Sequence, residues 1–419
     1  MYHRARQAWA TAGRAAACYH AGVKHAALIL TLAVCALPAQ TPRKVTDAEA
    51  REVHRSALLF DAHNDVPLRT VAGFDIGKRA PDGHTDLARL REGGVGAVFF
   101  AAWVAPSYAK ERQSAKRALE MIDTIRHDIS LRYPDGFAPA TSADEVEAAH
   151  RQGKVAAVIG VEGGHAIEND LRVLRALYAL GARYMTLTHV NTNDWADSSG
   201  DLRDPSVRHH DGLTDFGREV IREMNRIGML VDVSHVSDKT FADVLAVSTA
   251  PVIASHSSVR ALCNVPRNLT DGMMRALAAK GGLVGINFAC DYLSQKTADA
   301  VARYRIYSRW DELEKQHGGD PEKLKAEVAK LRAEMRAKVP RATLSDVVAH
   351  IDHAVRVAGV DHVGIGSDFD GIGCTPEGLD DVSQFPNLTR ALLEKGYTAA
   401  DIGKIYGGNL LRVMRAAAR

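Results

Sequence analysis

Residues 229–256 read MLVDVSHVSDKTFADVLAVSTAPVIASH. Two apolar runs, 229–233 and 252–254, are followed by Ser-His, and an amphipathic segment, 238–247, lies between them. Strands that are unbroken apolar runs are typical of a parallel sheet covered by helices on both faces. The stretch therefore predicts a strand–helix–strand unit with a histidine after each strand.

The same alternation continues along the chain in both directions. Expected strands cover residues 57–62, 95–101, 155–161, 184–188, 229–233, 252–254, 283–287 and 363–365. Amphipathic helices are expected at 112–126, 170–180, 215–227, 238–247 and 344–358. Eight such units favour an α/β fold of the (β/α)8 TIM barrel type. An open doubly wound sheet is the alternative that this pattern leaves.

One long segment, 291–340, interrupts the alternation after the seventh strand. It is highly charged and helical in pattern, for example PEKLKAEVAKLRAEMRAK at 321–338, and it is too long for an ordinary loop. We expect a helical insertion there. It is either a solvated hairpin without a part in the chemistry, or a lid or subunit contact.

The first 39 residues differ in character from the rest. A basic region precedes the apolar run AALILTLAVCA at 26–36, and small residues follow it. This order is typical of a secretory signal peptide, and the run is shorter than the roughly 20 residues that a membrane span needs. We expect export to the periplasm or the medium and no stable span after cleavage. A single folded domain is expected at 46–419, beginning with a capping box, Thr46 to Glu49.

The chain has 419 residues, 46% hydrophobic, with 53 basic and 51 acidic side chains. This size allows a large core, and the balanced charge does not indicate a nucleic-acid surface. Three cysteines follow the signal region, Cys263, Cys290 and Cys374. Cys263 and Cys290 are the first choice for a disulfide in an exported chain. Three buried free thiols are the alternative.

Ionisable residues follow six of the expected strands. They are His63 and Asp65, Glu162, His189, His235, His256, and Asp368. In an α/β barrel the carboxyl ends of the strands meet at one mouth, where the functional side chains lie. Because burying so many unpaired ionisable groups is costly, bound multivalent metal is the simplest explanation.

The spacing suggests how these residues share two ions. His63 and Asp65 lie two apart at a strand end and face the same side, so both can bind one ion. His235 and His256 follow adjacent strands and can bind a second. Glu162 lies between them in barrel order and can bridge both ions with its two oxygens. Imidazole and carboxylate ligands suit zinc, and manganese or cobalt also fits.

The sequence resembles the renal, or membrane, dipeptidase family of amidohydrolase-like barrels. The resemblance rests on these stretches: DAHNDV (61–66), GVEGGH (160–165), LTH (187–189), WAD (195–197), VDVSHVS (231–237), SHSS (255–258), VPRN (265–268), DHVGIGSDFDG (361–371) and GGNLL (407–411). They extend in family order from residue 61 nearly to the C-terminus. The insertion departs from the family pattern and leaves substrate preference open.

The resemblance implies a zinc dipeptidase with two ions, tolerant of a D-residue at the C-terminal position, and a possible homodimer. It implies that His189 contacts the substrate carbonyl oxygen, that Arg267 binds the terminal carboxylate, and that Asp368 moves the proton to the leaving amine. An amidase or lactonase on the same barrel is the second hypothesis, and a scaffold that keeps metal only for folding is the third. Asn287 is a further candidate for substrate contact, and His165 for support of Glu162.

Overall fold

Nine parallel strands form one sheet in the computed structural model, which describes residues 43–317 and 320–418. The strands are β1 (Leu59–Asn64), β2 (Val95–Trp103), β3 (Phe137–Pro139), β4 (Val155–Glu162), β5 (Ala182–Thr186), β6 (Leu230–Asp232), β7 (Val252–Ala254), β8 (Leu283–Ile286) and β9 (Val363–Ile365). Because β1 pairs with β2 and β9, and β2 also pairs with β4, eight strands close into a ring. The predicted (β/α)8 barrel is confirmed, and the open sheet is excluded.

All eight expected strands are present, with ends that differ by a few residues. Two of them, Val252–Ala254 and Val363–Ile365, match the prediction in full. The structure adds β3, which pairs with residues 155–157 of β4, while β5 pairs with residues 159–162. β3 therefore lies beside the start of β4 and is not a member of the ring, so β8 is the seventh barrel strand.

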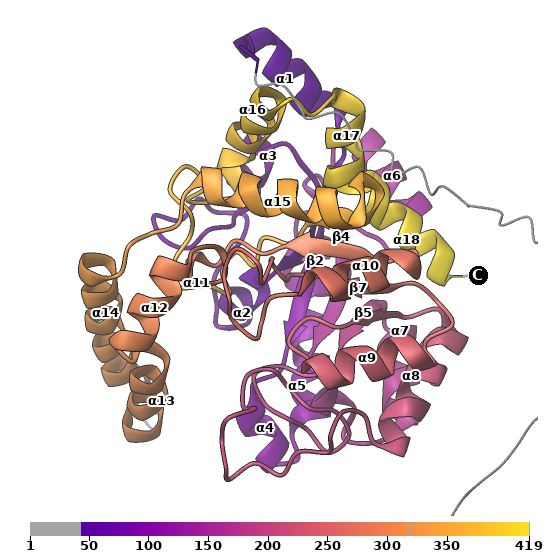
Figure 1. Ribbon diagram of the computed structural model, residues 1–419, viewed down its shortest axis with the longest axis vertical. Helices are drawn as coiled ribbons and strands as arrows, with labels where there is room; N and C mark the ends of the chain where they lie inside the picture. The colour runs from indigo at the N-terminus through magenta and orange to yellow at the C-terminus, as the bar shows by residue number, and fades with distance from the viewer. Residues whose placement is uncertain (1–42, 318–319, 419) are drawn as a thin grey trace, which may run out of the picture. The chain divides into compact units, whose positions relative to one another are not determined.

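Along the chain, most helices follow one strand and precede the next (Figure 1). The α-helices are α1 (Asp47–Ser56), α2 (Val66–Val71), α3 (Leu87–Glu92), α4 (Pro106–Lys110), α5 (Ser114–Asp123), α6 (Ala143–Arg151), α7 (Leu171–Ala179), α8 (Asp215–Ile227), α9 (Asp238–Val247), α10 (Asp271–Ala279), α11 (Cys290–Leu293), α12 (Gln295–Arg303), α13 (Ile306–His317), α14 (Pro321–Lys338), α15 (Leu344–Ala358), α16 (Phe385–Lys395), α17 (Ala399–Gly403) and α18 (Asn409–Ala417). Short 3-10 segments cover Gly164–Ile167, Val360–His362 and Val382–Gln384, and π-helical segments cover Thr124–Leu131 and Lys404–Gly408.

Three predicted helices, α8, α9 and α15, have the expected bounds. The helix expected at 112–126 differs, because α5 begins at Ser114 and continues into the π-helical segment 124–131. Thr46 caps α1 by accepting from the Glu49 amide, but the Glu49 carboxylate pairs with Arg43. In residues 43–317 and 320–418 no helix combines the length and apolar character needed to cross a bilayer.

A buried cluster fills the inside of the barrel below the strand ends. The ring centroids of Phe60 and Phe99 are 5.2 Å apart, and those of Phe99 and Tyr184 are 4.7 Å apart. Leu410 and Val413 of α18 belong to the same cluster. The interior is thus solid, and the open space for chemistry lies at the carboxyl ends of the strands.

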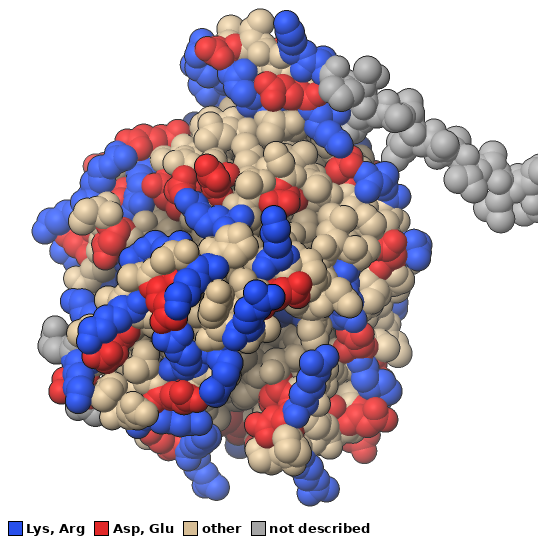
Figure 2. Space-filling view, turned by 60° about the vertical axis from the view of Figure 1, so that its left-hand side comes forward, with Lys and Arg blue, Asp and Glu red and all other residues tan. Residues whose placement is uncertain are grey.

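The predicted helical insertion, residues 291–340, consists of α12, α13 and α14 after the short α11. In Figure 1 these three helices group at the left of the view. The insertion has a small core of its own around Val301, Ile306 and Leu331. Its outer face carries positive and negative side chains in alternation (Figure 2), and Arg309 pairs with Glu334 at 2.6 Å to tie α13 to α14.

The predicted disulfide is wrong. Cys290 pairs with Cys374, and Cys263 is a buried free thiol, so the alternative of three free thiols is also wrong. Cys290 and Cys374 are 84 residues apart in sequence but lie on the loops that follow β8 and β9, which are neighbours in the barrel. Barrel order brings Cys290 and Cys374 together, which the spacing of the cysteines along the chain does not reveal.

Candidate metal centre and active site

The predicted ligands meet at one mouth of the barrel. His63 lies in β1 and Glu162 ends β4, while His235 and His256 follow β6 and β7 closely. All are buried, as is Asp65, which follows β1. Parallel strands in a ring present their carboxyl ends on one side, which is why residues far apart in sequence converge here.

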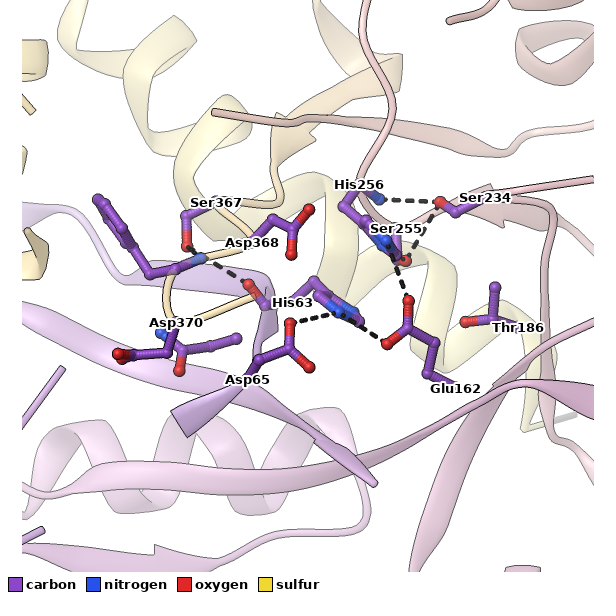
Figure 3. A network of polar contacts seen from close by, with 12 residues as sticks. His63, Asp65, Glu162, Thr186, Ser234, Ser255, His256, Ser367, Asp368 and Asp370 are labelled. Atoms are coloured by element: carbon purple, nitrogen blue, oxygen red, sulfur yellow. Dashed lines mark hydrogen bonds and ion pairs between the residues drawn. The ribbon is translucent and has the colours of Figure 1, made fainter. Parts of the chain in front are cut away.

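Glu162 lies at the centre, and its two oxygens face different partners. Oε2 lies 3.5 Å from His63 Nε2. Oε1 lies 3.1 Å from His235 Nε2 and 3.3 Å from His256 Nε2, and these two nitrogens are 3.0 Å apart. Each oxygen thus faces a different half of the site (Figure 3), and the two halves meet where the rings of His63 and His256 stack with centroids 3.7 Å apart.

The half around His63 also contains Asp65, whose Oδ2 lies 3.1 Å from His63 Nε2. Potential ligand atoms form three overlapping groups, each with its atoms within 4.8 Å of one another. These groups are His63, Glu162 and His256; Glu162, His189 and His235; and His63, Asp65 and Asp368. Two residues that the resemblance assigns to catalysis, His189 and Asp368, thus also lie within reach of a cation.

The charges of the site suit cations. Burial alone would lower the pKa of His63, but Tyr184, Glu162 and Asp65 raise it well above its ordinary value, so the surroundings favour a cation at this ring, either a proton or a metal ion in its place. Burial and the positive Arg267 hold the pKa of His235 well below its ordinary value. A neutral imidazole can offer its lone pair to a metal.

The pKa values of two carboxylates of the site, Glu162 and Asp368, are shifted in opposite directions. Burial raises the pKa of Glu162, but the charge of His63 and hydrogen bonds from His235 and His256 outweigh it and lower the pKa well below the usual range. Burial and the negative Asp65 raise the pKa of Asp368 well above its usual range. Glu162 is therefore ionised, and Asp368 is suited to hold a proton.

The donor set fits divalent metal. His63 Nε2 is buried and makes no hydrogen bond within the described part of the chain. The other ring nitrogen, Nδ1, is 2.7 Å from the Tyr184 hydroxyl, which leaves Nε2 directed at Glu162 and Asp65. Imidazole nitrogens and carboxylate oxygens that face one another at close range are the surroundings that zinc and similar ions bind.

Two site residues have a left-handed backbone. The φ angle is +70° at His235 and +62° at Asp368, a conformation that costs free energy and is often found at functional sites. The carbonyl of His235 accepts from the Ser199 amide at 2.7 Å, and the Asp368 amide donates to the carbonyl of His63 at 3.0 Å. These bonds hold both residues in place.

Two buried aspartates that sequence reasoning left without a role support the ligands. Asp232 Oδ2 accepts from Ser255 Oγ at 2.6 Å, and Ser255 Oγ lies 2.7 Å from His256 Nδ1. Asp61 accepts from the amide and hydroxyl of Ser367, which joins β1 to the loop after β9. Burial raises the pKa of Asp61 to about 6. The sequence feature that could have identified them is their spacing, because Asp61 precedes His63 by two positions and Asp232 precedes His235 by three.

Arg267 and His189 lie beside the centre. Arg267 Nη1 donates to Ser257 Oγ at 2.7 Å, whereas Nε and Nη2 are buried and have no partner in the ranges described. His189 Nε2 lies 3.9 Å from Glu162 Oε1. Burial lowers the pKa of His189 to about 4, so its ring is neutral at pH 7. Both side chains keep hydrogen-bonding capacity for a bound molecule.

The remaining candidates are placed as follows. Asn287 Nδ2 donates to Asp368 Oδ2 at 2.7 Å, so Asn287 touches a site residue directly. His165 Nε2 is 2.9 Å from the carbonyl of Val104, and that bond places the ring against the end of β2. Supporting contacts of this kind depend on tertiary structure, and the sequence could not distinguish them.

Known proteins resemble this chain over most of its length. The family described as membrane dipeptidase (peptidase family M19) matches residues 47–419. Dipeptidase 3 of Mus musculus is 36% identical over 373 residues, which cover 88% of this chain but only 66% of the mouse protein.

Solved structures agree with this result. The probable dipeptidase PvdM from Pseudomonas aeruginosa superposes with a TM-score of 0.75 at 28% identity, covering 88% of this chain and 98% of that one. A metallo peptidase from Rhodobacter sphaeroides, liganded with a phosphinate mimic of the dipeptide L-Ala-D-Ala, gives 0.70 at 27% identity, with 86% and 99% covered.

Proposed function

This chain belongs to the membrane dipeptidase family, peptidase family M19, and on that premise we propose that it hydrolyses free dipeptides in a metal-dependent reaction. One observation carries the proposal. The two oxygens of Glu162 face different ligand sets, His63 on one side and His235 with His256 on the other. A carboxylate so placed can bridge two cations.

His63 and Asp65 would hold one zinc ion, His235 and His256 the other, and Glu162 would bind both. Two ions held in this way can polarise a scissile carbonyl and increase the acidity of water between them. Zinc is proposed because of the histidine and carboxylate ligands, and manganese or cobalt would use the same donors.

The other residues would act on the substrate itself. Arg267 has two buried donors without partners, and a guanidinium matches a carboxylate bidentately, so we assign it to the C-terminal carboxylate. His189 would donate a hydrogen bond to the carbonyl oxygen. Asp368 would accept a proton from the attacking water and pass it to the leaving amine, which its raised pKa favours.

Tolerance of a D-residue at the C-terminal position is part of the proposal. It is supported by the Rhodobacter sphaeroides relative, whose bound ligand mimics L-Ala-D-Ala. Hydrolysis of L-Ala-D-Ala at a rate comparable to that of L-Ala-L-Ala would support the tolerance. Turnover of the L,L form alone would refute it without affecting the dipeptidase assignment.

The decisive experiment combines elemental analysis with a dipeptide panel. The purified protein should contain close to two zinc ions per chain and should hydrolyse Ala-Ala and Leu-Leu. The variant His63→Ala should lose metal and activity together, whereas His127→Ala, at an exposed histidine that pairs with Asp123, should lose neither. A protein that binds metal but hydrolyses no dipeptide would favour the scaffold hypothesis.

Arg267 separates a dipeptidase from an amidase or lactonase. We expect Arg267→Met to raise KM for glycine-containing dipeptides steeply while metal content stays unchanged. The matched control is Arg226→Met, because Arg226 is an arginine of α8 that pairs with Glu223. An unchanged KM in Arg267→Met would favour a substrate without a terminal carboxylate.

We further propose that residues 1–39 direct export and are removed, and that the mature chain forms a homodimer. Residues 1–42 lie outside the described part of the chain, so support comes from the Cys290–Cys374 disulfide, a bond that persists in oxidising compartments. Mass spectrometry of the exported protein would locate the mature N-terminus. Light scattering would give the oligomeric state.

A further inference from the structure

The helical insertion brings one side chain back to the barrel mouth. Tyr307, in the first turn of α13, donates its hydroxyl to Asp291 Oδ2 at 2.7 Å. Asp291 is 6% exposed, whereas Tyr307 is 55% exposed. The hydroxyl end of Tyr307 is thus anchored on α11, the short helix that follows β8, while much of the residue remains open to solvent.

The anchor lies beside the proposed carboxylate-binding group. Asp291 is followed by Tyr292, and the guanidinium carbon of Arg267 lies 5.6 Å from the centroid of the Tyr292 ring. The carbonyl of Tyr292 accepts from Asn268 Nδ2 at 2.8 Å, which ties this turn to the loop that carries Arg267. The insertion and the Arg267 loop therefore meet at Asp291 and Tyr292.

Electrostatics agree with this position. Burial raises the pKa of the Tyr307 hydroxyl well above its ordinary value, and the negative charges of Asp291 and Asp368 act in the same direction. The same negative charges, together with burial, raise the pKa of Tyr292. These shifts agree with the hydrogen bond between Tyr307 and Asp291, which places the Tyr307 hydroxyl beside the turn at Tyr292.

We propose that the Tyr307 ring forms one wall of the pocket that receives the side chain of the substrate's C-terminal residue. This inference rests on the proposed dipeptidase function. If Arg267 holds the terminal carboxylate, the side chain of the same residue lies near Arg267 and so near Tyr292, whose neighbour Asp291 anchors Tyr307. Tyr307 is 55% exposed, and an aromatic ring that is this accessible offers apolar surface that a ligand can cover.

A purely structural role for Tyr307 predicts different behaviour. If Tyr307 only fastened the insertion through its hydroxyl, Tyr307→Phe and Tyr307→Ala would have the same effect, and the effect would not depend on the substrate side chain. If the ring contacts substrate, Tyr307→Phe keeps the wall and only Tyr307→Ala removes it.

The test compares Ala-Gly with Ala-Leu, which differ only in the C-terminal side chain. We expect Tyr307→Ala to raise KM for Ala-Leu about tenfold and to leave KM for Ala-Gly within about twofold, with kcat for Ala-Gly retained. Tyr307→Phe should keep the wild-type ratio. Inhibition constants for phosphinate mimics of Ala-Gly and Ala-Leu should show the same pattern.

Arg309→Ala is the control for loosening of the insertion, because it removes the ion pair with Glu334 that joins α13 to α14 and leaves the ring in place. It should keep the wild-type preference for Ala-Leu. Equal KM changes for both substrates in Tyr307→Ala, or loss of preference in Tyr307→Phe or Arg309→Ala, would overturn the inference. Failure of the wild-type protein to hydrolyse either dipeptide would instead refute the proposed function.

Discussion

The side-chain amide of Asn287 donates a hydrogen bond to Asp368 Oδ2 at 2.7 Å. The side-chain oxygen of Asn287, Oδ1, accepts from the backbone amide of Ala289, so the side-chain amide is oriented from both ends. One carboxylate oxygen of Asp368 is thereby fixed, and the other is left for a proton. Asn287 is thus a positioning residue for the proposed proton carrier.

Replacing Asn287 should therefore slow the reaction more than it weakens substrate binding. We expect Asn287→Ala to lower kcat by roughly ten- to a hundredfold, as loss of a supporting hydrogen bond commonly does, with KM within about twofold and metal content unchanged. Asn225→Ala is the control, because Asn225 bonds Ser248 and Thr249. Unchanged kcat in Asn287→Ala would contradict the positioning role.

The Cys290–Cys374 disulfide joins the loops that carry Asn287 and Asp368. Removing a crosslink over 84 residues frees the unfolded chain, and we expect Cys290→Ser with Cys374→Ser to lower the free energy of unfolding by roughly 2–4 kcal/mol. Activity should also fall, because the Asn287–Asp368 contact loosens. Urea unfolding and steady-state kinetics would measure both effects.

Cys263→Ser is the matched control for the disulfide. The Cys263 thiol bonds the carbonyl of Asp291 at 3.3 Å, and burial raises its pKa to about 12, so it is unreactive at neutral pH. The control should retain the disulfide and its sensitivity to reductant. Equal stability of the double variant and the control would contradict a stabilising role for the crosslink.

Much of the fold could be predicted because the barrel strands are unbroken apolar runs. The pattern failed where tertiary contacts decide: three-residue β3 is too short to produce a periodic signal, and the 112–126 segment shifts into a π-helix at Thr124. The disulfide was mispredicted because proximity of Cys290 to Cys374 depends on the pairing of β8 with β9.

The position of the site could also be predicted from the strands. Polar residues at the ends of parallel strands must converge in a barrel, and this alone brought His63, Glu162 and His256 together. Residues that act from within the strands were missed, because Tyr184 reads as one more core aromatic until its hydroxyl is seen 2.7 Å from His63 Nδ1.

Tyr184→Phe tests that contact. Removing the hydroxyl leaves His63 Nδ1 without its buried partner, so the ring is less firmly oriented towards Glu162 and Asp65. We expect affinity for the bound metal to fall about ten- to a hundredfold, while kcat at saturating metal changes little. Competition with a chelator would measure the affinity. Tyr397→Phe, at a buried tyrosine bonded to Asp352, should leave it unchanged, and equal affinities in both variants would contradict the role of Tyr184.

A buried histidine outside the site makes stability depend on pH. His350 Nδ1 accepts from the Val259 amide at 3.0 Å, and Nε2 donates to the Leu293 carbonyl at 2.9 Å. The bond from Val259 requires an unprotonated Nδ1, whereas the bond to Leu293 is compatible with either state of the ring. Burial lowers the pKa of His350 to about 4 from an ordinary value of 6.5.

Between pH 6.5 and pH 4 His350 is protonated in the unfolded chain but not in the folded protein. The free energy of unfolding should therefore fall as the pH drops from 6.5 towards 4. The shift corresponds to about 3 kcal/mol in full, of which about 2 kcal/mol is lost by pH 5. Urea unfolding at pH 7.5 and 5.0 should show that His350→Gln, though less stable at pH 7.5, loses about 2 kcal/mol less than the wild type on acidification. Titrations of the metal ligands are common to both proteins and cancel in this difference, so parallel losses would show that His350 is not the group responsible.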